Sequence, residues 1–260
     1  MKIIIEFIQS MADNVVLWSS LIINIYFCVD LIKKKCVRRK LKAILPVKDR
    51  EVCVLTSEQR DARNGIMITF EQAYVLSVFA KLYKIAGKEI EIKSLSSYME
   101  KIQSSSEVCI GGPLDNILTD RYIDMYFPQF KTFIQEEKLS QYTFEHKTVI
   151  NSEKQGFIIP EISFLIEDAD TDYFVLIKLN ENDLKEKKTV IILFGYTRKG
   201  LMCGIKFLYN NYKKIYRKYK DKHFFLIGKC SKQALQVNNG EISDLTKVMF
   251  EGGQDIEKFR

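Results

Sequence analysis

Residues 189–220 read TVIILFGYTRKGLMCGIKFLYNNYKKIYRKYK and predict a strand, a glycine turn and a long helix in direct succession. TVIILFG is a continuous apolar run, which is typical of a strand covered on both faces. In the helix, apolar positions such as Leu201, Ile205 and Leu208 recur on one face, and most of the cations lie elsewhere. Strand, turn and helix in this order indicate an α/β protein.

The same alternation occurs earlier in the chain. VCVL at 52–55 precedes a helical pattern at 68–87 that ends at Gly87, and EIEIK at 89–93 precedes a polar helical stretch at 96–104. VCIGG at 108–112 then leads into a helical pattern at 114–127. Strands alternating with helices predict crossover units and a Rossmann-like, mostly parallel sheet with helices on its faces.

The later segments add strands of other kinds. Residues 130–167 contain short alternating runs that predict an antiparallel β insertion, whereas YFVLIKL at 173–179 and TVIILFG are expected to rejoin the central sheet. Residues 224–250 predict two closing strands with a turn at Asn239-Gly240.

An apolar segment near the start of the chain has the length of a membrane span. NVVLWSSLIINIYFCVDLI at 14–32 is 19 residues long, enough to cross the ~30 Å apolar layer of a bilayer. Seven of the next ten residues, 33–42, are Lys or Arg, and by the positive-inside rule the large carboxyl-terminal part is cytoplasmic. We therefore expect a single-pass protein of the cell inner membrane, with an extension at 1–13, a transmembrane helix at 14–32, a basic connector at 33–48 and a cytosolic α/β sensor domain at 49–260.

Polar residues form a stripe on this helix. At 100° per residue, Glu6, Asp13, Ser20 and Asn24 fall within an arc of about 100°. Unpartnered polar side chains are costly in lipid, so the stripe predicts a homo-oligomer with these residues turned inward. The alternative is that residues 6–13 lie outside the bilayer as an amphipathic extension.

Composition and motifs argue against several functional classes. The formal charge of +7 is concentrated at 33–42 and 213–222, and the six cysteines contain no CxxC pair. No zinc site, disulfide framework or cofactor is expected. His146 and His223 lie in strand-like runs and no GxSxG or HExxH motif occurs, so nothing argues for an enzyme.

The basic stretch 213–222, with its interleaved tyrosines, could contact anionic lipid or nucleic acid, or could simply be a solvated helix face. No DNA or RNA duplex is expected as a partner.

Three loops are candidates for a ligand site because ligands of open α/β sheets bind at the carboxyl ends of the strands. The candidate residues are Thr56 and Ser57 after the first strand, Gly111, Gly112 and Asn116 after the third, and Gly195, Thr197, Arg198, Lys199 and Gly200 after the strand at 189–194. Together they could hold a nucleotide-like anion. The alternative is that the glycines only form turns, since neither of the two loops that contain glycine matches GxGxxG or GxxxxGK[ST].

Val15–Ile32, Val108–Asn116 and Val190–Gly204 together carry a resemblance in architecture. A transmembrane helix joined to a Rossmann-like domain with glycine loops resembles the membrane-tethered, nucleotide-sensing effectors of prokaryotic antiviral defence, whose sensor is CARF-like or SLOG-like. The resemblance implies a sensor of a nucleotide second messenger that disrupts the membrane through oligomeric helices, without enzymatic activity. The alternatives are a membrane-anchored enzyme acting on a nucleotide or glycosyl substrate, and a passive membrane scaffold.

Overall fold

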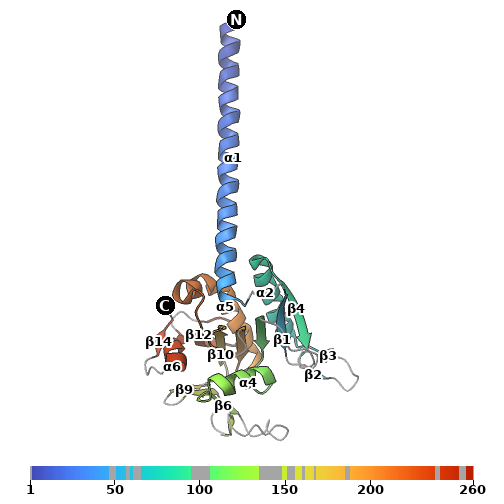
Figure 1. Cartoon of the computed structure of the whole chain (residues 1–260), viewed down its shortest axis with the longest axis vertical. Helices are drawn as coiled ribbons and strands as arrows, with labels where there is room; N and C mark the ends of the chain where they lie inside the picture. Colours follow the sequence, from blue (N-terminus) through green and yellow to red (C-terminus); the bar gives the residue numbers. More distant parts are fainter. Residues whose placement is uncertain are drawn as a thin grey trace.

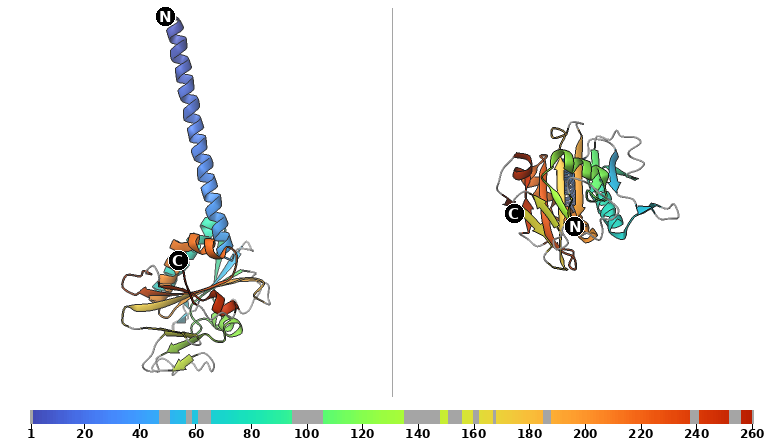
Figure 2. Two further views of the ribbon diagram at one scale, coloured as in Figure 1. Left: turned by 90° about the vertical axis from the view of Figure 1, so that its left-hand side faces the viewer. Right: turned by 90° about the horizontal axis from the view of Figure 1, so that it is seen from below.

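A single long helix projects from an α/β domain in the computed structural model (Figures 1 and 2). The described residues are 2–46, 51–56, 59–60, 66–94, 106–134, 148–150, 156–159, 162–166, 168–184, 188–237, 241–251 and 256–259, and in the helix the side chains are described at 18–19 and 21–44. Helix α1 (Lys2–Ile44) has 43 residues and is therefore about 65 Å long. The expected span at 14–32 and most of the expected connector at 33–48 thus form one uninterrupted helix.

Within the described part of the chain, no helix meets the length and hydropathy required to cross a bilayer. Residues 14–17 and Ser20 of the expected span, like Glu6 and Asp13 of the expected stripe, lie outside the part whose side chains are described.

The domain is built on a mixed sheet whose eight described strands lie in the order β14-β13-β12-β10-β11-β5-β1-β4. In chain order these strands are β1 (Glu51–Thr56), β4 (Glu89–Ser94), β5 (Ser106–Ile110), β10 (Thr171–Leu179), β11 (Thr189–Gly195), β12 (Phe224–Ser231), β13 (Ile242–Asp244) and β14 (Glu257–Lys258). The strands expected at 173–179 and 189–195 do rejoin the central sheet.

The expectation of a mostly parallel sheet is wrong. β4, β1, β5 and β11 pair in parallel, but β11, β10, β12, β13 and β14 pair antiparallel, so four of the seven neighbouring pairs are antiparallel. β10 and β12 lack alternation because helices and a second small sheet cover both faces, and burial on both faces removes the polar-apolar pattern by which antiparallel strands are usually recognised.

Helices and a small sheet cover the two faces. One face carries α2 (Phe70–Ala86), α5 (Arg198–Tyr219) and the end of α1, and the other carries α4 (Ile117–Tyr126) and α6 (Thr246–Glu251). The helices expected at 68–87, 114–127 and 195–220 are therefore confirmed. Thr69 and Gln72 form a capping box at the start of α2, and Gly87 ends α2 in the left-handed conformation, with φ of 71°.

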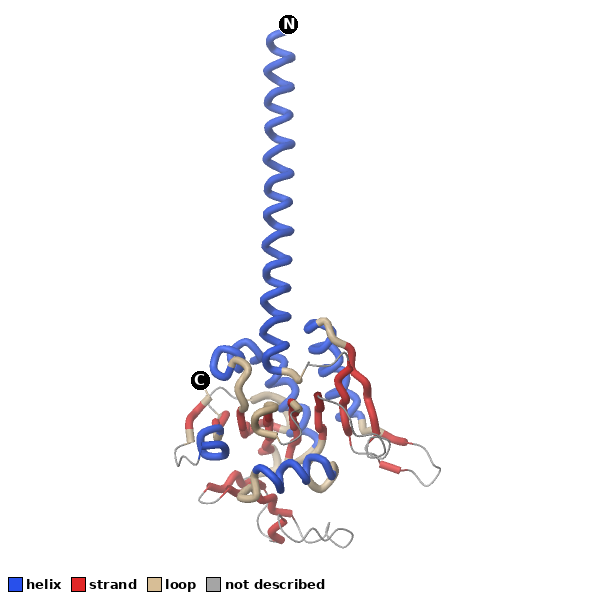
Figure 3. The backbone as a smooth tube through the Cα atoms, viewed as in Figure 1, coloured by secondary structure: helices blue, strands red, loops and turns tan. Residues whose placement is uncertain are grey.

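The insertion at 130–167 packs on the face that carries α4. It contains β6 (Lys131–Ile134), β7 (Thr148–Ile150), β8 (Gly156–Ile159) and β9 (Ile162–Leu165), in the order β7-β6-β8-β9, with β6 and β7 parallel and the other pairs antiparallel. A short hairpin, β2 (Gln59–Arg60) and β3 (Ile66–Met67), lies near the end of the domain that carries β1 and β4 (labelled in Figure 1; same view in Figure 3). The expected helix at 96–104 lies wholly outside the described residues, as do Asn239-Gly240 and His146.

Candidate functional site

The projecting part of α1 exposes large apolar side chains around most of its circumference. Ten are exposed, including Tyr26 at 72% and Ile22 at 65%. The full set is Trp18, Leu21, Ile22, Ile23, Ile25, Tyr26, Phe27, Val29, Leu31 and Ile32. At 100° per residue these positions leave open only an arc of about 80°, which contains Asn24, whereas a helix on the surface of a water-soluble domain is apolar on one face only. An exposed apolar surface of this kind, called the apolar belt below, is typical of a site that contacts a membrane or another protein.

Polar groups border and interrupt the belt. Asn24 is exposed within it, and Asp30 forms an ion pair with Lys34, with 2.7 Å between Oδ2 and Nζ. The hydrogen bond from Lys34 to Asp30 raises the pKa of the lysine. Asn24 is an exposed, uncharged polar residue of the described belt that could hydrogen-bond to another helix.

The other end of α1 is part of the domain core. Leu41, Ile44 and Leu45 are buried, and α1 contacts both α2 and α5. The hydroxyl of Tyr83 donates to the carbonyl of Pro46 at 3.1 Å, just after the helix ends. The helix is thus fixed to the domain by packing and hydrogen bonds, and a rotation of its base would disturb α2 and α5.

Lys178 on β10 also holds this end of α1. Its ammonium group donates to the carbonyls of Ala43, at 2.5 Å, and Asp221, at 2.9 Å. A cation at the carboxyl end of a helix is favoured by the helix dipole. Burial nevertheless lowers the pKa of Lys178 to about 8. The run YFVLIKL at 173–179 was expected only to form a strand, and its single lysine is the sequence signal for this contact.

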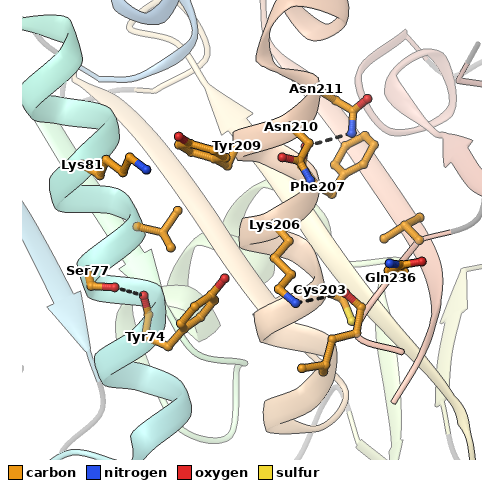
Figure 4. Close-up of a pocket in the computed structure, with 13 residues that line it drawn as sticks. Tyr74, Ser77, Lys81, Cys203, Lys206, Phe207, Tyr209, Asn210, Asn211 and Gln236 are labelled. Atoms are coloured by element: carbon orange, nitrogen blue, oxygen red, sulfur yellow. Dashed lines mark hydrogen bonds between the residues drawn. The ribbon is translucent and has the colours of Figure 1, made fainter. Parts of the chain in front are cut away.

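A groove of about 690 Å³ lies between α2 and α5, the two helices that contact the base of α1 (Figure 4). Lys81 on α2 reaches toward Tyr209 on α5, with 4.9 Å from its Nζ to the ring centroid. Hydrogen bonding to Tyr209 raises the pKa of Lys81. Lys206 donates weakly to the carbonyl of Leu235 at 3.5 Å, which places a second ammonium group in the groove.

The remaining polar residues of the groove are neutral. They are Tyr74, Ser77, Asn210, Asn211 and Gln236. Among the described residues that line the groove, none is acidic. Two cations, aromatic rings and carboxamides suit a ligand that combines negative charge with a planar ring and hydrogen-bonding edges.

Cys203, which lines the groove, lies beside a second thiol. Cys203 on α5 hydrogen-bonds to Cys230 on β12, which lowers the pKa of Cys203 and raises that of Cys230. Both are buried, and Cys203 Sγ is 3.8 Å from the carbonyl oxygen of Ser231. In the described part of the chain, no three His, Cys, Asp or Glu residues gather as a metal site would require.

The three predicted loops do converge on one edge of the sheet. Thr56 pairs with Ile110, and Ile110 pairs with Leu193, so the carboxyl ends of β1, β5 and β11 are adjacent. The side chain of Thr56 and all of Ser57 lie outside the described residues. This edge is at the opposite end of the sheet from the base of α1, because Lys178 pairs with Ile191 whereas Gly195 pairs with Phe174.

In the loop after β5, the predicted residues cap a helix. Asn116 is fully buried, accepts from the amides of Leu118 and Thr119 at 3.0 and 3.3 Å, and donates to the carbonyl of Ile110 at 3.1 Å. The amide of Gly111 donates to the carbonyl of Leu193, and Gly111 has a φ of 111°, which only glycine adopts readily. Gly112 lies beside Phe194. These contacts fit the conformational alternative.

In the loop after β11, a carboxylate of the protein occupies the helix amino terminus. Asp172, fully buried on β10, accepts from the amide of Gly200 at 2.9 Å and from the hydroxyl of Thr197. A Cβ at Gly200 would lie 2.4 Å from the carbonyl oxygen of Tyr173, and one at Gly195 would lie 2.1 Å from the amide of Leu201. Arg198 and Lys199 are exposed. Asp172 thus fills the place that the sequence analysis assigned to an anionic ligand.

His223 makes contacts within the fold: its Nδ1 lies 2.9 Å from Asp183 Oδ1, and its ring stacks on Phe250.

Comparison of the chain with protein-family models, curated proteins and solved structures gave no match.

Proposed function

We propose that this chain is a membrane-anchored sensor whose α1 spans the bilayer and whose cytoplasmic domain binds a nucleotide-like anion. The observation that carries the proposal is the apolar belt around α1, which continues in one unbroken helix into the domain core. A bilayer supplies apolar contact on all sides of such a helix. The basic residues at 33–42 favour a cytoplasmic domain at the inner membrane.

The groove between α2 and α5 is the proposed ligand site. Lys81 and Lys206 suit phosphate groups, and the tyrosines suit a base. The hydrogen bonds made by Asn116 and Asp172 argue for the groove over the loops at the far edge of the sheet.

The proposed output is a change in how α1 helices associate. The helices that form the groove, α2 and α5, are also the two that hold the base of α1. A ligand that binds one spacing of α2 and α5 better than another therefore shifts the population of α1 orientations. In an oligomer, this shift changes the packing of the spans and the integrity of the bilayer.

The proposal is tested with the full chain in liposomes. We expect alkaline carbonate to leave the chain in the membrane fraction. In detergent micelles, a mononucleotide, dinucleotide or cyclic oligonucleotide is expected to raise the thermal unfolding midpoint. Lys81→Gln together with Lys206→Gln should remove this shift, and Lys199→Gln, a matched change outside the groove, should retain it.

The output is measured separately as release of a dye enclosed in the liposomes. Release that requires both the stabilising nucleotide and the groove lysines supports the sensor-effector. Extraction of the chain by carbonate, or no stabilisation by any nucleotide, would refute the anchor or the ligand site respectively. Turnover of the nucleotide would favour a membrane-anchored enzyme instead.

A further inference from the structure

Basic residues that are far apart in the sequence meet around the base of α1. They lie at three places: Lys33–Lys42 on α1, Lys84 and Lys88 at the end of α2, and the exposed cations within Lys213–Lys222 at the end of α5. Figures 1 and 2 show that α2 and the final turns of α5 (orange) reach the side of the domain from which α1 emerges. We call these residues the cationic collar.

Specific contacts fix this arrangement. A Cβ at Gly87 would lie 3.0 Å from Arg38 Cζ, so the guanidinium of Arg38 lies over Gly87 at the end of α2. The ammonium of Lys178 binds the carbonyls of both Ala43 and Asp221, which joins the end of α5 to the end of α1. The ends of the three helices are therefore held together as one surface.

The collar has an excess of positive charge. Asp30, Glu89, Asp183 and Asp221 also lie near it, and Asp30 is paired with Lys34. Lys218 is paired with two carboxylates, those of Asp244 and Glu257, at distances of 2.5 and 3.2 Å. By contrast Arg217, Lys220 and Lys222 are exposed. Among the described residues of this side, cations outnumber carboxylates.

The height of the collar on α1 matches a headgroup layer. The apolar belt ends at Ile32, and Arg38 is six residues further, about 9 Å along the axis. The polar layer of a bilayer extends about 5–8 Å beyond the apolar layer on each side, and the Debye length at physiological salt is about 8 Å. Long basic side chains at the collar can therefore reach lipid phosphates.

We infer that the cationic collar binds anionic phospholipid headgroups and holds the α/β domain against the membrane face. This inference rests on the proposed insertion of α1. It assigns the final turns of α5 to a lipid surface, and it gives the groove a fixed position relative to the bilayer.

The experiment is lysine acetylation of the full chain in nanodiscs, followed by mass spectrometry of each site. The discs contain phosphatidylcholine alone or with phosphatidylserine. A surface potential of about −30 mV raises the pKa of a nearby ammonium by about half a unit, so collar lysines should react roughly threefold more slowly in the anionic discs. Lys199, at the other end of α5, and Lys232 should react equally in both.

A pair of variants tests whether the collar causes the contact. Arg217→Gln with Lys222→Gln should restore faster acetylation of Lys84 and Lys88 in the anionic discs, whereas Arg198→Gln with Lys199→Gln should leave them protected. Equal rates for collar lysines in both kinds of disc, with the chain still resistant to carbonate extraction, would overturn the collar and leave the anchor intact. A chain that carbonate releases would overturn both.

Discussion

Lys178 carries a positive charge in an almost fully buried position, with 3% of its surface exposed, and this makes stability depend on pH. Its pKa is about 8 in the folded protein and 10.5 in the unfolded chain. Between these values the unfolded chain binds more protons, so the free energy of unfolding rises with pH in that window. Below pH 8 the cost of the buried charge is fully present.

We predict that the free energy of unfolding in micelles depends on pH differently in the wild type and in Lys178→Met. From about pH 7.5 to about pH 9.5, the wild type should gain on the order of 1–2 kcal/mol relative to the variant. Tyrosines titrate in both proteins, so their contribution cancels in the comparison. Parallel pH profiles would mean that Lys178 keeps an ordinary pKa.

At the same scale, the sequence points to polar residues of the loops but not to their partners. Asn116 and Thr197 are ligand candidates because their loops follow strand ends, and in the structure they cap α4 and α5. The carboxylate that fills the start of α5 comes from Asp172, 25 residues before Thr197 and on another strand. A loop pattern alone contains no information about such a partner, because the partner is set by strand pairing.

At the scale of the element, helices were predicted within a few residues and strand direction was not. The 3.6-residue period gave α2 and α5 directly, with Gly87 as a stop. β10 and β11 are continuous apolar runs, which fit parallel or antiparallel pairing equally when both faces are covered. The docking of α1 had a signal, since Leu41, Ile44 and Leu45 follow helical spacing after the basic cluster.

Asn24 permits a prediction about α1 as an element. An exposed carboxamide in the apolar belt can hydrogen-bond to its equivalent on another helix, a contact of about 0.6–2 kcal/mol in membranes. We expect Asn24→Leu to weaken self-association roughly 3- to 30-fold, measured by energy transfer between labelled chains in liposomes. Ile23→Leu is the control on the adjacent face. Equal energy transfer for the two variants would argue that Asn24 faces lipid.

At the scale of the molecule, the groove could not be predicted because α2 and α5 are more than a hundred residues apart in sequence. Lys81 and Lys206 each look like a solvated cation on its own helix. Only the pairing of β1 with β5 and of β5 with β11 brings the two helices onto one face, with the base of α1 beside them. The same assembly joins the basic clusters at 33–42 and 213–222 into one surface.

This assembly makes α1 part of the folded domain, and matched isoleucine truncations test that. Ile44 is fully buried in the core, whereas Ile32 is 61% exposed on the apolar belt. We predict that Ile44→Ala lowers the free energy of unfolding by about 2–4 kcal/mol, because it removes buried methyl groups between α1 and the domain. The readout is the thermal unfolding midpoint of the domain in micelles, which should fall by roughly 2–4 °C for each kcal/mol. Ile32→Ala removes the same atoms from a surface that contacts detergent in both the folded and unfolded domain, so the midpoint should stay unchanged. If both variants left the midpoint unchanged, α1 would be a tether hinged at its base, and ligand binding in the groove could not reorient it.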